Sequence, residues 1–408
     1  MHLIWPILGC VIVVTGVTDV SQDRVAPLLD VEQCVIALED SDVQVRRRAI
    51  ADLALHTTVG AETIMRIVDI CKRHHGEVGL QLTSFEALEA LGPRAAPAIP
   101  FLTSVLLDEE DPPSINDPSW YAGLALRAMG PAAAPAIPSL LKALRSEVLS
   151  TRKVAIEALG AIGPEAGVAV PVLFDMALHD KGGGLIWSIQ DKAKRALAKI
   201  GAPAVSLLLD ALTNECDRRR ELAAEVLYRM TLELPHSALS AKSSLKHAMQ
   251  DKTAIVQVYS ALAYWNLSRE VAEVRPLLLF VIRKYIRDRD CSPHVGYPPD
   301  VEAAIIGLRH LGADAAPAVE LLVEVLEQKK GEFFKRLAVE TLGELGDVAR
   351  PAIPRLREMS RTPGETMRAA ADALLKITSN SGDENSDVHK EQGTKPQAVQ
   401  PRQRKDEP

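Results

Sequence analysis

The sequence predicts an all-α fold, a right-handed α-solenoid of about nine two-helix repeats closed by a capping helix. Three observations predict it: a helix-ending and helix-starting segment that recurs along the chain, a fixed apolar pattern before each copy, and the composition. Hydrophobic residues make up 47% of the 408 residues, whereas aromatic residues make up only 4%. That balance favours helices packed through Ala, Leu, Ile and Val.

The recurring segment is clearest as LGPRAAPAIPFL at residues 91–102. Gly92 suits the left-handed position just past a helix, and Pro93 cannot continue that helix. Pro97 and Pro100 have backbone angles preset for the entry and first turn of the next helix. Further copies of the segment begin at Gly130, Gly163, Gly201, Gly312 and Gly346.

The helix before each copy has a small residue eight positions before the turn and a leucine four positions before it. Ala155 and Leu159 occupy these positions before Gly163, and the spacing places both on one helix face. Turn positions of this pattern occur at 57, 92, 130, 163, 201, 231, 268, 312, 346 and 378, so the period is 30 to 44 residues. A period of this length with two helices per unit is typical of an α-solenoid.

The pattern resembles HEAT repeats, and specifically the bacterial subgroup described as similar to phycobilisome-lyase repeats. DVQVRRRA at residues 42–49 matches the Asp, Val-Arg and Ala positions of that subgroup, and 152–155 and 368–370 repeat part of it. The resemblance covers residues 41–378. It implies an interaction scaffold with varied partners, whose second helices line the concave face. Tetratricopeptide repeats have a similar period, but their Trp, Tyr and Phe positions are missing here, and armadillo repeats would need a third helix.

Composition divides the chain into four parts. Residues 1–20 hold an apolar run, which predicts a signal peptide or an N-terminal hydrophobic anchor with a membrane tether through residues 3–17. We expect a capping helix within 21–40, the solenoid over 41–378 and a disordered polar tail over 379–408. The expected location is therefore the periplasm, the exterior or a membrane surface. The alternative is a cytoplasmic protein whose first segment is a buried helix or follows a misplaced start.

The overall charge is acidic, with one local exception. A formal net charge of -7 argues against general nucleic-acid binding, which usually needs a strongly basic face. Residues 275–290 instead carry five basic and two acidic side chains. The helical spacing here predicts a basic patch for an acidic partner, extended from the preceding second helix, and a plain solvated helix face is the alternative. The predicted patch comprises Arg283, Lys284, Arg287, Lys242 and Lys246.

The longest connections are expected at one rim of the solenoid. They cover residues 108–120, 180–184 and 288–300, and each joins the second helix of one unit to the first helix of the next. Loops of one connection type project from the same edge. This rim is a second candidate contact surface, with Trp120 as its exposed aromatic residue, and tolerated surface insertions are the alternative.

No catalytic, cofactor or metal site is predicted. Cys71 with His74 and His75, and Cys291 with His294, supply too few ligands each. The two groups are also about six units apart, roughly 60 Å, so they cannot share one ion. A nucleophile elbow and the His-Glu pairs of HEAT-like iron enzymes are both absent from the sequence. Whether Cys34 and Cys71 form a disulfide is left open.

These observations predict a non-enzymatic scaffold that binds another protein, of unknown identity, through the concave face or the inserted rim. One alternative, suggested by the name of the resembling subgroup, is a phycobilin-lyase-like factor for chromophore attachment. The other is a nucleic-acid-binding HEAT-like protein. Acidic charge and few aromatic residues weigh against the second alternative.

Overall fold

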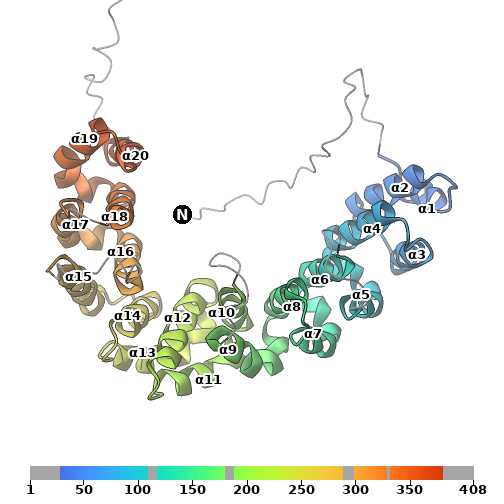
Figure 1. Ribbon diagram of the computed structural model, residues 1–408, viewed down its shortest axis with the longest axis horizontal. Coiled ribbons are helices and arrows are strands. Elements are labelled where there is room, and N and C mark those ends of the chain that lie inside the picture. The colour runs from blue at the N-terminus through green and yellow to red at the C-terminus, as the bar shows by residue number, and fades with distance from the viewer. Residues whose placement is uncertain (1–27, 109–116, 180–187, 288–297, 329–330, 380–408) are drawn as a thin grey trace, which may run out of the picture. The chain divides into compact units, whose positions relative to one another are not determined.

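The computed structural model describes residues 28–108, 117–179, 188–287, 298–328 and 331–379 (Figure 1). Within these ranges the chain is helical throughout, without a β-strand, which confirms the all-α solenoid. The described chain divides into two compact units between Met129 and Gly130, and each is described by itself. The predicted N-terminal signal or anchor, the polar tail after Ser379 and most of the three predicted rim insertions lie outside the described residues.

The first unit is a short double layer of helices. Helices α2, α4 and α6 pack in sequence against one another, α3 and α5 lie behind them, and α1 packs on α2. Helix α1 begins with a reciprocal capping box between Asp30 and Gln33, which satisfies two otherwise unpaired backbone amides. The bounds are α1 (Val31–Ala37), α2 (Val43–Leu55), α3 (Ala61–Arg73), α4 (Val78–Leu91), η1 (Gly92–Ala98), α5 (Ile99–Leu106) and α6 (Pro118–Met129).

The second unit continues the alternation in two layers. The first-layer helices are α8 (Leu149–Ile162), α10 (Ile189–Ile200), α12 (Asp217–Glu233), α14 (Ala254–Ser268), α16 (Pro299–Leu311), α18 (Glu332–Leu345) and α20 (Met367–Ser379). The second-layer helices are α7 (Ile137–Ala143), α9 (Val170–His179), α11 (Ala202–Leu212), α13 (Lys242–Ala248), α15 (Val271–Arg287), α17 (Val319–Leu326) and α19 (Ile353–Arg361). Short 3₁₀ helices join most pairs, namely η2 (Gly130–Ala136), η3 (Gly163–Ala169), η4 (Pro235–Ala241), η5 (Gly312–Ala318) and η6 (Gly346–Ala352).

The predicted turn glycines all adopt positive φ angles, from +56° to +79°. Gly163 has φ 79° and ψ -139°, a region that is almost exclusive to glycine. The residues after each turn glycine form a 3₁₀ turn, except at Gly201, where α11 follows directly. Ala155 and Leu159 are fully buried before Gly163, so the predicted core positions are confirmed.

Two apolar segments, Pro118–Ala143 and Leu149–His179, meet the length and composition of a membrane span. Each contains a positive-φ glycine and a 3₁₀ turn rather than one continuous helix. In Leu149–His179, 56% of the most apolar stretch is buried inside the protein. Core packing therefore accounts for the apolar character of this segment.

The prediction that second helices line the concave face is wrong for the second unit. There the first-layer helices follow the inner side of the curve and the second-layer helices follow the outer side (Figure 1). The physical reason is the size of the side chains between first-layer helices. A Cβ atom on Gly160 of α8 would lie only 2.9 Å from the Ala196 Cα atom of α10. A Cβ atom on Gly343 of α18 would lie at the same distance from the Ala373 Cα atom of α20. The more closely spaced row takes the inside of a curve.

Candidate functional site

An exposed stripe of five residues runs along helix α15 in the outer layer of the second unit. The members lie at 276, 280, 283, 284 and 287, a spacing that places them on one helix face. Phe280 is 62% exposed and is the aromatic member of this face. We call this surface the α15 stripe, and it consists of the exposed residues Pro276, Phe280, Arg283, Lys284 and Arg287.

The opposite face of α15 fixes the orientation of the stripe. Val274, Leu278 and Ile282 are fully buried, where α15 packs against α14, α16 and α17. Turning the stripe inward would expose these three side chains to water, at a cost of about 1.5–3 kcal/mol for each. Lys284 and Arg287 stand in the last turn, where the partial negative charge of the helix end favours cations. The stripe is therefore a stable outward-facing feature.

The basic members of the stripe are free to engage a ligand. Arg283, Lys284 and Arg287 have no side-chain hydrogen bond or ion pair with any described residue. Exposed cations without a partner keep their full charge for an incoming group, subject only to screening by salt. In contrast, most basic side chains on the first layer of this unit are paired with acids, as Lys194 is with Glu225 at 2.6 Å.

The structure does not bring Lys242 and Lys246 together with the stripe. The Lys246 Nζ atom lies 2.6 Å from Glu273 Oε1, and the Lys242 Nζ atom lies 3.6 Å from Glu270 Oε1. Both ammonium groups also stand 5.6 Å from the centre of the Tyr264 ring. Glu273 lies in the first turn of α15 and Glu270 directly precedes the helix, so both acids are about 15–20 Å along the axis from Arg283. The two lysines therefore belong to a local, charge-balanced cluster.

Hydrogen bonding ties this lysine cluster together. The Tyr264 hydroxyl donates to Glu270 Oε2 at 2.6 Å. This bond is the main reason why the pKa of the Glu270 carboxyl is lowered, and the charge of Lys242 adds to the effect. The cluster holds α13, α14 and the start of α15 in place. We assign it a structural role.

Trp120 lies in the first turn of α6 in the first unit. Its side chain is half-buried, and its backbone amide donates to Asp117 O at 3.1 Å. The neighbouring rim residues 109–116 are outside the described chain. Its role as an exposed rim contact stays a prediction.

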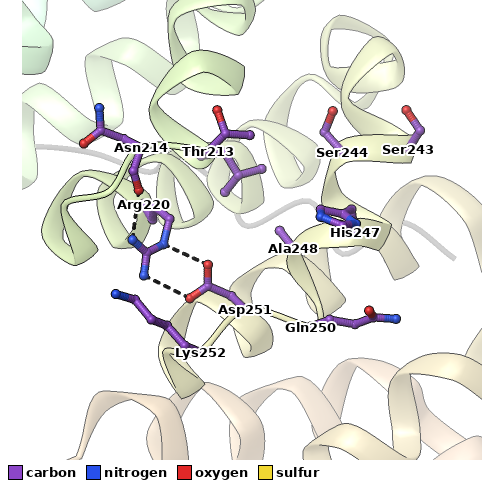
Figure 2. A pocket seen from close by; sticks show the side chains of 11 residues that line it. Thr213, Asn214, Arg220, Ser243, Ser244, His247, Ala248, Gln250, Asp251 and Lys252 are labelled. Atoms are coloured by element: carbon purple, nitrogen blue, oxygen red, sulfur yellow. Dashed lines mark hydrogen bonds and ion pairs between the residues drawn. The ribbon is translucent and has the colours of Figure 1, made fainter.

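The rim itself contains a polar pocket of about 640 Å³ between the starts of α12 and α14 and helix α13. Figure 2 shows Arg220 reaching across this pocket to Asp251. The Arg220 Nε atom donates to Asp251 Oδ2 at 2.8 Å, and its Nη1 atom donates to the carbonyls of Asn214 and Glu215, both at 2.9 Å. Arg220 is only 5% exposed. The N–H donors of its guanidinium group are already hydrogen-bonded to protein atoms, so Arg220 links consecutive repeats and is not available to bind a ligand.

The same arrangement recurs in the first unit. The Arg46 Nη1 atom donates to the carbonyls of Asp40 and Ser41, and its Nη2 atom pairs with Glu77 at 3.0 Å. Arg46 is one of the residues on which the HEAT resemblance rests. The buried arginine thus has a physical explanation, because it satisfies loop carbonyls and an acid of the next repeat at once.

The cysteines and histidines do not assemble a metal site in the described chain. Cys34, Cys71 and Cys216 are free thiols, so the structure contains no Cys34 to Cys71 disulfide. No cluster of three potential metal ligands occurs among the described residues, and Cys291 and His294 lie outside them. The His74 Nδ1 atom instead contacts Glu77 Oε1 at 3.0 Å.

Comparison with solved structures identifies the fold. No protein-family model matches the chain, and no curated protein matches it. Crystal structures of two Kap121p mutants are similar to it, with TM-scores of 0.51 and 0.50 and identities of 15% and 14%. Each match covers 88% of this chain and 42% of the Kap121p chain, so this chain spans about two fifths of its structural neighbours. The chain therefore has the architecture of a HEAT-repeat solenoid.

The sequence pattern predicted the three basic residues of the stripe but not its aromatic member. Phe280 sits inside the uninterrupted apolar run LLLFVI at residues 277–282, which indicates burial on every side. Its spacing from Arg283, Lys284 and Arg287 was the available signal. A helical projection places Phe280 between these cations and Pro276 on the solvent side.

Proposed function

We propose that the protein is a non-enzymatic scaffold that binds an acidic segment of a partner protein on the α15 stripe. The observation that carries the proposal is the alignment of exposed Phe280 with three cations on one face of α15 that have no ion-pair partner among the described residues. A large apolar side chain can anchor a contact, and surrounding charges select the partner and speed its approach.

The chemistry of the stripe defines what it can recognise. Two or more carboxylates at helical or extended spacing would meet Arg283, Lys284 and Arg287, and an apolar side chain between them would cover Phe280. Arginine suits this task because its planar guanidinium group can donate two parallel N–H hydrogen bonds, one to each oxygen of a carboxylate. A solenoid supports such recognition by holding α15 rigidly on packed neighbours.

Two finer expectations accompany this proposal. The match of residues 42–49 supports membership of the subgroup similar to phycobilisome-lyase repeats, and a chromophore-attachment partner is the corresponding alternative. The apolar run within residues 1–20 supports export or membrane anchoring. Fractionation of cells that express the full chain with a C-terminal tag tests this location, and recovery of uncleaved protein from the cytosol alone contradicts it.

The binding test compares two charge-reversed proteins. Full-length wild-type protein captures partners from a lysate of its native host, and each partner identified by mass spectrometry is then purified and titrated by calorimetry. We expect R283E/K284E/R287E to weaken binding at least tenfold, which equals about 1.4 kcal/mol. Phe280→Ala should weaken it severalfold, because truncation removes the apolar anchor.

The matched control is R357E/R361E/R368E. These three arginines are exposed on α19, at its end and on α20, and have no side-chain ion pair with a described residue, so the control carries the same change of charge elsewhere. Binding within twofold of wild type is expected. Equal loss in both triple variants would indicate a diffuse charge effect, and unchanged binding in R283E/K284E/R287E would show that the stripe is the wrong surface. Turnover of a substrate by the pure protein would contradict the scaffold itself.

A further inference from the structure

A small pocket opens on the inner layer of the second unit, between α12, α14 and α16. Its volume is about 160 Å³, which is larger than the space of one water molecule and smaller than a drug-sized pocket. Leu262 and Ile306 supply apolar lining, and Tyr228, Tyr259 and Glu302 supply the polar groups. It lies apart from the α15 stripe, so its role does not depend on the acidic partner proposed above.

Two neutral tyrosine rings form one wall of the pocket. The rings of Tyr228 and Tyr259 are 5.7 Å apart and inclined by 24°. The Tyr228 hydroxyl lies 3.3 Å from His310 Nδ1. Burial raises the pKa of Tyr228 to about 12 and also raises the pKa of Tyr259, so both rings are uncharged at neutral pH. A neutral phenol ring presents an electron-rich face, which attracts cations.

Among the described residues that line the pocket, Glu302 is the charged one. Its side chain is half-buried and has no ion pair or hydrogen bond with a described residue. The nearby acids differ in this respect, because Arg229 pairs with Glu225 at 2.8 Å and with Asp191 at 3.0 Å. A negative group beside a tyrosine wall favours a cationic ligand and repels an anionic one.

From these contacts we infer that the pocket binds an alkylammonium group. The tyrosine faces and the apolar lining contact its carbon atoms, and the Glu302 carboxylate neutralises its charge. The volume admits one such group and excludes larger ligands. The group belongs either to a free amine or to the side chain of a lysine, and the two sources share this chemistry.

The test uses defined probes with the full-length protein. Ligand-observed NMR titrations compare choline with 3,3-dimethylbutan-1-ol, a neutral molecule of nearly the same shape, and with N-acetyl-lysine methylamide. We expect at least one of the two cations to bind at least tenfold more tightly than the neutral alcohol. Preference for choline assigns a free quaternary amine, and preference for the lysine derivative assigns a lysine side chain.

Variants locate the binding. Glu302→Gln should lower the affinity for the cation at least tenfold. Glu320→Gln, which changes an exposed carboxylate on α17, should leave this affinity unchanged. Tyr259→Phe keeps the ring and should retain binding, and circular dichroism confirms that each variant is folded. The inference is overturned if neither cation binds, if the neutral alcohol binds equally well, or if Glu302→Gln has no more effect than Glu320→Gln.

Discussion

Gly160 in α8 and Gly163 in the turn after it are three residues apart. Replacing either one with alanine should lower the stability of the protein, but for different physical reasons. Gly160 lies inside α8, where an added Cβ atom would stand 2.9 Å from Ala196 Cα and 3.1 Å from Ala196 Cβ. Gly163 follows the helix at φ 79°, and its added Cβ atom would meet nothing closer than 3.9 Å. Gly160 is therefore constrained by space and Gly163 by backbone conformation.

The expected magnitudes follow from these geometries. Gly160→Ala gains about 1 kcal/mol of helix propensity but forces α8 and α10 apart, and such overpacking costs about 1–3 kcal/mol. The net effect should be a loss of about 1 kcal/mol. Gly163→Ala gains no helix propensity and places a side chain in a glycine-only region, at a cost of about 1–3 kcal/mol. Gly76→Ala is the control, because its added Cβ atom meets nothing within 4 Å, and it should stay within about 0.5 kcal/mol.

Hydrogen exchange measured by mass spectrometry separates the two mechanisms. Gly160→Ala should speed exchange in both α8 and α10, because the clash lies between them. Gly163→Ala should act mainly at the end of α8 and in η3, since interactions in a solenoid are largely between neighbours. Increased protection of α8 and α10 in Gly160→Ala, as for an exposed helical glycine, would refute the close approach of these helices.

Two further predictions concern titratable side chains. Burial raises the pKa of Cys34 and Cys71 to about 11, so roughly one thiol in a thousand is ionised at pH 8; iodoacetamide should label exposed Cys216 in native protein and the two buried thiols only in urea, as peptide mass spectrometry would show. Labelling of Cys71 at the rate of Cys216 would contradict its burial. Hydrogen bonds from Lys252 and then Arg220 lower the pKa of Asp217 below its ordinary value of 3.8, so the stability contributed by this carboxylate is present above pH 3.8 and is lost as the pH falls further. The gap in urea midpoint between wild type and Asp217→Asn should therefore be larger at pH 5 than at pH 3, and a constant gap would rule out the ion pairs.

The repeat architecture was predictable because its signals are local. A positive φ after a helix requires glycine, and proline cannot continue a helix, so Gly163 with Pro164 marks a turn without knowledge of the tertiary structure. The prediction of which helix lines the concave face was wrong because the repeat pattern in the sequence is compatible with either helix of the pair on the inner side. The deciding contact joins Gly160 to Ala196 in the next repeat, and their small size was the one signal present in the sequence.

For the candidate surfaces as well, the sequence pattern predicted what lies on one helix but not the contacts between helices. Helical spacing sufficed to align Arg283, Lys284 and Arg287 on one face. It could not reveal that Lys246 pairs with Glu273 on another helix. The pocket of Tyr228, Tyr259 and Glu302 draws one residue from each of three helices, so it depends on the register between repeats, which the repeat pattern does not specify.

The contact between Gly160 and Ala196 also determines how the second unit can flex. Helices whose backbones already touch cannot be compressed, because protein interiors are close to the density of crystals. The first layer therefore acts as the nearly incompressible side of a bending strip, and changes of curvature occur mainly by opening or closing the spaces between outer helices. A partner held across two outer helices would stiffen the array, whereas a ligand on the inner layer would leave its bending almost unchanged.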